Sequence, residues 1–129
     1  KIKGPERICL VTDGISAAGM DGKEGELYDP SSKQTIVIED GVGKLADRQS
    51  FAGSIATTDR LVRNMVQLAD VPLVQAVKMM TATPARMIGL GRTKGAIAPG
   101  MDADLVFFDD DIRISTVMIA GDVAYNGKE

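Results

Sequence analysis

The sequence contains no histidine and no tryptophan among its 129 residues. Without histidine, the chain by itself can form neither a Ser-His-Asp triad nor the commonest kind of catalytic zinc site. The single cysteine, Cys9, excludes an internal disulfide, and its place in an apolar run predicts a buried and inert thiol. This cysteine usage favours a reducing cytoplasm as the compartment.

The chain also has few aromatic side chains, little net charge and no long apolar run. Two Tyr, three Phe and a net charge of -3 argue against a nucleic-acid-binding surface, which needs basic and stacking groups. No run approaches the roughly 18 apolar residues of a membrane-spanning helix, so no membrane partner is expected. The chain does not begin with Met, and we interpret it as a processed product or an excised piece of a longer protein.

The most informative stretch covers residues 7–14. Its four apolar residues, 8–11, predict a short strand buried on both faces, and Gly14 favours a turn directly after it. Asp13 therefore follows the carboxyl end of a predicted strand. Because loops at that end form the active-site face of parallel α/β folds, Asp13 is a candidate catalytic residue. The alternative is that Asp13 only caps a turn or a helix.

The predicted elements downstream come in the order hairpin, helices and strands. A small-residue loop leads into a hairpin insert over residues 26–45, with Asp40-Gly41 as a type I′ turn. Capping residues, apolar periodicity and glycine or proline punctuation predict the remaining boundaries. We predict helices over residues 57–69, 72–81 and 83–88, and strands over residues 103–109, 114–120 and 123–125, with a tight turn at 121–122. One strand followed by helices is not a complete α/β sheet, which indicates the closing portion of something larger.

Several blocks resemble one enzyme family, in that family's order. Residues 11–19 are similar to the final barrel strand and following loop of the N-acetylglucosamine-6-phosphate deacetylases of the amidohydrolase superfamily. Phe51-Ala52-Gly53-Ser54 resembles their substrate-contacting loop Leu-Ala-Gly-Ser, with Phe51 in place of Leu. The other blocks are Arg63-Asn64, residues 83–90, and residues 95–106 with their superfamily-wide signature of the small β domain.

The resemblance implies an α/β fold with two parts. It implies the C-terminal part of a metal-dependent hydrolase TIM (β/α)8 barrel, that is, its last strand and helices, together with strands of the small β-sandwich domain. Residues 1–90 would be the end of the barrel domain, with the hairpin insert at 26–45 and the helices within 57–89. Residues 91–129 would be the C-terminal strands of the small β domain.

The resemblance also implies a chemistry. The family removes the acetyl group from N-acetylglucosamine 6-phosphate, giving glucosamine 6-phosphate and acetate. A divalent metal (Zn, Fe, Mn or similar) polarises the amide carbonyl and lowers the pKa of the attacking water. Asp13 is implied as the general acid/base, and the backbone of Phe51, Ala52 and Gly53 as substrate-binding.

The resemblance assigns no metal ligand to this chain, because the family's ligands are a Glu and two His on earlier strands. The full-length protein would be a homodimer. Without the metal site, we expect the 129-residue chain alone to be inactive.

Two alternatives stay open. Another amidohydrolase, dihydroorotase-like or deaminase-like, would share the β-domain signature and the strand-end Asp13. The Phe51-Ala52-Gly53-Ser54 loop argues against it. A non-catalytic β-rich binding module would explain the absent histidines without any missing chain.

Overall fold

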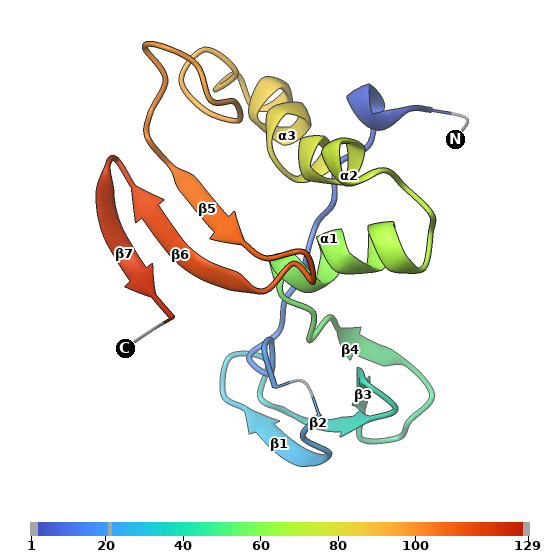
Figure 1. Cartoon of the computed structure of the whole chain (residues 1–129). Helices are drawn as coiled ribbons and strands as arrows, with labels where there is room; N and C mark the ends of the chain where they lie inside the picture. The colour runs from blue at the N-terminus through green and yellow to red at the C-terminus, as the bar shows by residue number, and fades with distance from the viewer. Residues whose placement is uncertain (1–2, 21, 128–129) are drawn as a thin grey trace. The chain divides into compact units, whose positions relative to one another are not determined.

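The computed structural model describes residues 3–20 and 22–127. Residues 1–2, 21 and 128–129, which include the outer ends of the two predicted domains, lie outside the described part. The described chain is α/β, as predicted, and forms two compact units. One unit is Val11–Thr58, and the other combines Lys1–Leu10 with Asp59–Glu129 (Figure 1).

The first unit, Val11–Thr58, is built on a four-stranded antiparallel sheet with the order β1-β2-β3-β4. Its strands are β1 (Gly25–Asp29), β2 (Gln34–Glu39), β3 (Val42–Leu45) and β4 (Phe51–Gly53). The predicted hairpin insert is confirmed, and so is its type I′ turn, because Asp40 and Gly41 both have positive φ, 54° and 72°. The short strand β4 was not predicted.

The core of this unit lies under strand β2. The β-branched run Ile36, Val37 and Ile38 lies in this strand, as its strand propensity predicts, and all three side chains are buried. Ala17 and Ile55 pack with Ile38, and three partly buried side chains close the cluster: Ile15, Met20 and Leu27. The loop that follows Asp13 is therefore anchored to the sheet by apolar contacts.

A buried carboxylate organises the turn at the end of β1. Asp29 is only 4% exposed, and its Oδ1 accepts hydrogen bonds from the backbone N–H of Ser31 (3.1 Å) and from the Ser31 hydroxyl (2.7 Å). Its Oδ2 accepts from the Ser32 hydroxyl at 2.8 Å. Hydrogen bonds from Ser31, then Ser32, favour the ionised form and lower the pKa of Asp29 to about 2.

The prediction for residues 8–11 was wrong. This segment is extended, but it is not a strand, and Val11 is 73% exposed instead of buried. A strand buried on both faces needs a hydrogen-bonded neighbour on each side and a layer above and below. Among the described residues no strand pairs with this segment. Cys9, predicted to be buried, is half-buried, and its Sγ lies 3.2 Å from Sδ of Met87.

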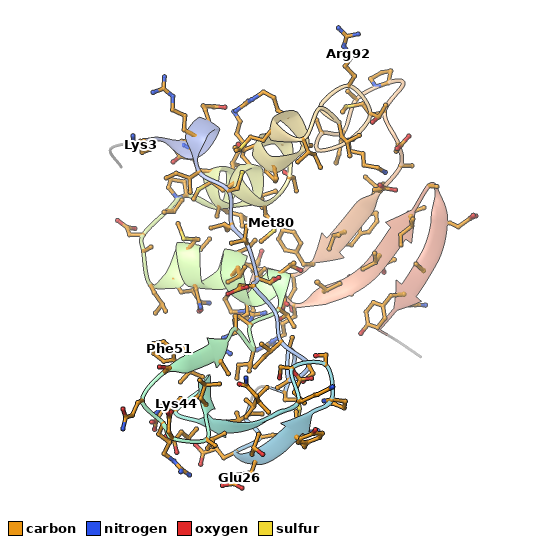
Figure 2. All side chains as sticks on the ribbon, turned by 180° about the vertical axis from the view of Figure 1, so that it is seen from behind. Lys3, Glu26, Lys44, Phe51, Met80 and Arg92 are labelled. Atoms are coloured by element: carbon orange, nitrogen blue, oxygen red, sulfur yellow. The ribbon has the colours of Figure 1, made fainter. Side chains whose placement is uncertain are left out.

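The second unit contains the short 3-10 helix η1 (Pro5–Arg7) and three helices close to the predicted ranges. They are α1 (Thr58–Gln67), α2 (Leu73–Met80) and α3 (Ala82–Met87). Gly89 follows α3 with φ 82°, as expected for a glycine that ends a helix. The helix core is formed by Val62, Ala76 and Ile112, and Met80 packs against it (Figure 2).

A three-stranded antiparallel sheet completes the second unit, with the order β5-β6-β7 (Figure 1). Its strands are β5 (Leu105–Phe108), β6 (Ile114–Ile119) and β7 (Asp122–Asn126). The tight turn falls on Ala120-Gly121, one residue earlier than predicted, and both residues have positive φ. The predicted strand over residues 103–109 is thus present as β5, and its apolar side chains Val106 and Phe107 are about half exposed. Within the described ranges no helix is long and apolar enough to cross a membrane.

Arg63 on α1 holds the loop between β5 and β6. Its Nε donates to the carbonyl of Asp111 (3.0 Å), and its Nη2 donates to the carbonyl of Ile112 (2.8 Å). The same Nη2 pairs with Asp59 at 2.9 Å. Ile112 is 4% exposed and has φ 60°, an unfavourable conformation for a β-branched residue. The guanidinium therefore holds the loop in the conformation that places Ile112 in the helix core.

We predict that Arg63→Met lowers the free energy of unfolding of the second unit by about 2 kcal/mol, since charged hydrogen bonds to two carbonyls are lost while the aliphatic stem remains. Urea denaturation measures this change. The control is Arg92→Met, because Arg92 is exposed and projects away from the ribbon (Figure 2). An equal midpoint for the two variants would contradict the role assigned to Arg63.

We predict a pH dependence from Asp29. Its folded-state pKa of about 2 lies below the ordinary 3.8, so its contribution to stability is present above about pH 4 and is lost as the pH falls toward 2. Asp29→Asn should lower the melting temperature at pH 7 and flatten its decline between pH 4 and pH 2. Asp110→Asn, on an exposed turn, is the control. The same decline of melting temperature with pH in wild type and Asp29→Asn would contradict the prediction.

Candidate active site

Asp13 stands where the extended segment enters the first unit. Its φ is 46°, in the left-handed region that few residues other than glycine adopt, although Asp tolerates it better than most. Its carbonyl accepts a hydrogen bond from the N–H of Ser54 at 3.0 Å. Its side chain is exposed and has no hydrogen-bonded partner among the residues that the structure describes. The backbone of Asp13 is thus fixed by this hydrogen bond, and its carboxylate is open to a ligand.

The structure brings Asp13 together with Gly53 at the end of β4. Gly14 and Ser54 form a parallel β-bridge, in which Ile15 N–H donates to the Ser54 carbonyl at 3.1 Å. A Cβ atom added to Gly53 would lie 3.2 Å from the carbonyl oxygen of Asp13. Two segments far apart in the sequence are therefore in backbone contact.

Phe51 and Ala52 extend along β4 from this contact. β4 is an edge strand of the sheet, so part of its backbone faces away from β3 and is open to pairing with a ligand. Phe51 is opposite Lys44 of β3, and its side chain is 74% exposed (Figure 2). Of the three predicted substrate-binding residues, Gly53 is the one whose position beside the Asp13 carbonyl is fixed by a close contact.

The lack of a side chain at Gly53 is required by packing. A Cβ at this position would lie 2.5 Å from Cγ2 of Ile15, and φ is 130°, which L side chains rarely adopt. The space beside Gly53 is thus occupied by Ile15. The sequence-based interpretation assigned the backbone of Gly53 to substrate binding and did not single out Ile15.

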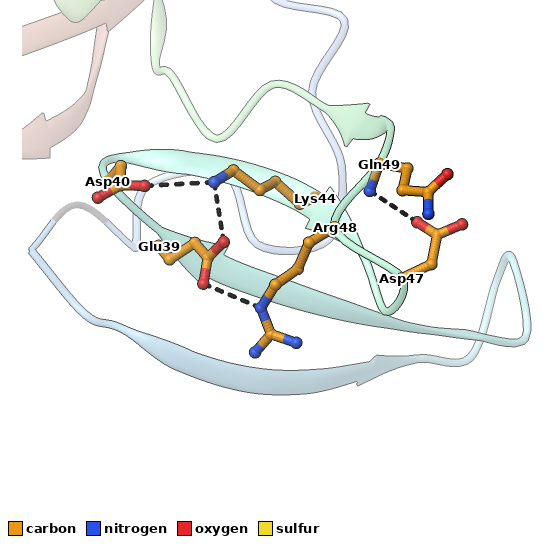
Figure 3. Close-up of polar contacts among 6 residues, drawn as sticks. All are labelled: Glu39, Asp40, Lys44, Asp47, Arg48 and Gln49. Carbon is orange, nitrogen blue, oxygen red and sulfur yellow. Dashed lines mark hydrogen bonds and ion pairs between the residues drawn. The ribbon is translucent and has the colours of Figure 1, made fainter.

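Ion pairs support the loop that leads into β4 (Figure 3). Glu39 accepts from Lys44 (2.8 Å) and from Arg48 (3.1 Å), and Asp40 accepts from Lys44 at 3.2 Å. The hydrogen bond from Lys44, followed by that from Arg48, lowers the pKa of Glu39, and its partner Lys44 has a raised pKa for the same reason. At the start of the same loop, Asp47 accepts from the N–H of Gln49 at 2.9 Å. These contacts order the chain just before β4, the strand of the candidate substrate-binding residues.

The described residues do not form a metal site by themselves. No group of three or more His, Cys, Asp or Glu side chains in residues 3–20 and 22–127 is arranged to hold a metal ion. Asp13 supplies a single accessible carboxylate. No described residue is therefore assigned as a metal ligand.

Residues 7–124 match the model of the amidohydrolase family. The chain belongs to this family. The resemblance seen in the sequence is therefore confirmed, and it covers almost the whole chain. Amidohydrolases are generally metal-dependent, which fits the class of chemistry that the sequence implied.

Named relatives refine the comparison. This amidohydrolase chain is 30% identical to the N-acetylglucosamine-6-phosphate deacetylase of Mus musculus, over 97% of this chain and 30% of that protein. It is 35% identical to the N-acetylgalactosamine-6-phosphate deacetylase of Shewanella sp. (strain ANA-3), over 100% of this chain and 31% of that protein. The chain thus spans about 30% of the length of these relatives.

A solved structure of a deacetylase is also similar to this chain. A point mutant of N-acetyl-D-glucosamine-6-phosphate deacetylase from Mycobacterium smegmatis, in complex with N-acetyl-D-glucosamine-6-phosphate, is 35% identical to this chain, with a TM-score of 0.79. The similarity covers 93% of this chain and 31% of that one. The described fold is therefore that of part of such an enzyme.

We predict that Gly53→Ala lowers the free energy of unfolding of the first unit by about 3 kcal/mol, because overpacking against Ile15 adds to the strain at positive φ. Chemical denaturation measures the loss. Gly22→Ala provides a control, since φ there is also positive but nothing lies within 4 Å of an added Cβ. Equal losses in the two variants would show that the contact with Ile15 contributes nothing.

Proposed function

We propose that the chain is the carboxyl-terminal part of a hydrolase that removes the acetyl group from N-acetylglucosamine 6-phosphate, giving glucosamine 6-phosphate and acetate. The observation that carries this proposal is the backbone contact between Asp13 and Gly53, which puts a residue with an exposed side chain beside the edge strand β4. The family match and the deacetylase names of the relatives support it. Those names favour a deacetylase over a dihydroorotase-like enzyme, a deaminase-like enzyme or a non-catalytic module.

Asp13 would act as the general acid/base. Its carboxylate takes a proton from the water whose oxygen attacks the acetamide carbonyl carbon. As the C–N bond breaks, Asp13 returns that proton to the amine nitrogen of the sugar, so one water is consumed and the carboxylate is regenerated. The side chain of Asp13 is exposed and has no partner among the described residues, so it can approach both the water and the leaving nitrogen.

The backbone of Phe51, Ala52 and Gly53 would bind the sugar. The open side of an edge strand offers N–H and C=O groups to the hydroxyl groups of a hexose, as it would to another strand. Gly53 also adjoins the backbone of Asp13, so a sugar bound on β4 would lie beside the residue that carries the carboxylate.

A divalent metal would be held by residues outside this chain. When bound, such a metal polarises the amide carbonyl and lowers the pKa of water. The described residues offer no ligand set for it, so the contribution of this chain is the proton transfer and the sugar contacts.

The remaining parts of the proposal concern the whole protein. Residues 1–90 would close a TIM barrel, and residues 91–129 would add strands to a small β-sandwich domain. The complete enzyme would be a cytoplasmic homodimer in amino-sugar metabolism.

N-acetylgalactosamine 6-phosphate is a second candidate substrate, because an N-acetylgalactosamine-6-phosphate deacetylase is 35% identical to this chain. The two sugars differ only in configuration at C4. Measuring kcat/KM of the full-length protein with both epimers separates the two functions, and we expect the glucosamine epimer to be preferred. Preference for the galactosamine epimer would replace the first proposal by the second.

We predict that Asp13→Asn in the full-length protein lowers kcat by at least about 100-fold, since the amide cannot take up the proton. The metal content should stay nearly unchanged. Asp70→Asn is a matched control, because Asp70 is exposed and has a positive φ of 51°. Retention of most of the activity in Asp13→Asn would show that another group moves the proton.

We also predict that the 129-residue chain by itself has no deacetylase activity. It lacks histidine, and its described part lacks a metal-binding group of side chains. The test is acetate release by the purified chain with added Zn²⁺ or Mn²⁺, with the full-length protein as the positive control. Turnover by the chain alone would overturn the proposal that the metal is held elsewhere.

A further inference from the structure

The side chain of Ile15 lies on two glycines that face each other across β3 and β4. Gly43 and Gly53 are paired residues in the antiparallel register of these strands. A Cβ on Gly43 would lie 2.8 Å from Cδ1 of Ile15, and a Cβ on Gly53 would lie 2.5 Å from its Cγ2. Both branches of the isoleucine thus contact backbone where any other residue would put a methyl group.

This contact is continuous with the backbone of Asp13. The residues that flank Gly14 both pair with Ser54, since Asp13 accepts from its N–H and Ile15 donates to its carbonyl. Ile15 also packs on the cluster that contains Ala17, Ile38 and Ile55. A displacement of Ile15 would therefore have to move the backbone that carries Asp13, because the opposite side of its side chain is occupied.

Asp13 needs such support. Its φ of 46° lies in a sparsely populated region, and residues in that region keep their conformation only where the surroundings impose it. The surroundings here are the Ser54 pairing and the side chain of Ile15, two residues further on.

We propose that Ile15, seated on the facing glycines Gly43 and Gly53, is a positioning residue for Asp13. Strand β3 of the hairpin thereby supports the position of Asp13, although none of its residues is assigned a substrate contact. The proposal rests on the proposed function, in which Asp13 moves the proton. It adds Ile15 and Gly43 to the residues on which turnover depends.

The test uses Gly43→Ala and Gly43→Val in the full-length protein. Gly43 lies in a strand and does not have a positive φ, so alanine would be tolerated there if Ile15 were absent. We expect kcat to fall about tenfold for Ala and further for Val, because small displacements of a catalytic group have large effects on rate. KM should stay within about twofold. A KM that rises while kcat is unchanged would overturn the proposal.

The rescue is the double variant Gly43→Ala/Ile15→Val. Valine lacks the Cδ1 atom that the new methyl group would meet, so one carbon is added and one removed. We expect kcat of the double variant to return to within about threefold of that of the Ile15→Val single variant. Failure of this rescue would show that alanine damages the strand in another way, which would also overturn the proposal.

The control is Gly25→Ala at the start of β1. Gly25 has φ 140° and nothing within 4 Å of an added Cβ, so the substitution strains the same sheet without reaching Ile15. We expect a lower melting temperature with kcat unchanged.

If Gly43→Ala does not fold, Ile15→Ala tests the proposal in its place, because it removes the contact without adding bulk. A kcat equal to wild type in Ile15→Ala would overturn the proposal.

Hydrogen exchange separates this proposal from the proposed function. If Asp13→Asn retains its turnover, the catalytic role of Asp13 fails and kcat no longer reports its position. The amide protons of Ile15 and Ser54 then report the contact directly. Faster exchange of both in Gly43→Ala, reversed in the double variant, supports the positioning contact, and unchanged exchange overturns it.

Discussion

The candidate site depends on the pairing of Ser54 with the two residues on either side of Gly14. This pair of hydrogen bonds, 3.0 and 3.1 Å long, joins the segment that carries Asp13 to the end of β4. It is possible only because Gly43 and Gly53 leave room for Ile15. Asp13, in an uncommon backbone conformation, is thereby fixed beside β4, the strand proposed to bind the sugar. The chemistry proposed for the site follows from this contact.

The second unit depends on hydrogen bonds from a charged side chain to backbone carbonyls. Arg63 of α1 donates hydrogen bonds to the carbonyls of Asp111 and Ile112, and Ile112 packs in one core with Val62 and Ala76. The loop between β5 and β6 is therefore part of the helix core. In this chain Arg63 thus attaches the loop of the β5–β7 sheet to α1.

The elements that were predicted correctly are those with local signals. Asp40-Gly41 specifies its own turn, since both residues accept positive φ, and the helices are delimited by Pro72, Gly89 and apolar periodicity. Strand β4 was missed because it has three residues, and only pairing with β3 makes it a strand. Residues 8–11 were misassigned because an apolar run indicates burial but does not supply the strands that would pair with it. The role of Asp13 came from the family resemblance and remains a proposal.

The sequence by itself determined what chemistry this chain lacks and where its turns and helix ends fall. Histidine is absent, so no histidine ligand can come from it, and Asp40-Gly41 and Gly89 accept the positive φ that a hairpin turn and a helix end require. Only the tertiary structure decided that Ile15 lies on Gly43 and Gly53, and that Ser54 holds Asp13. Such contacts join residues far apart in the chain. They depend on the register of the paired strands and on which side chain packs against each glycine.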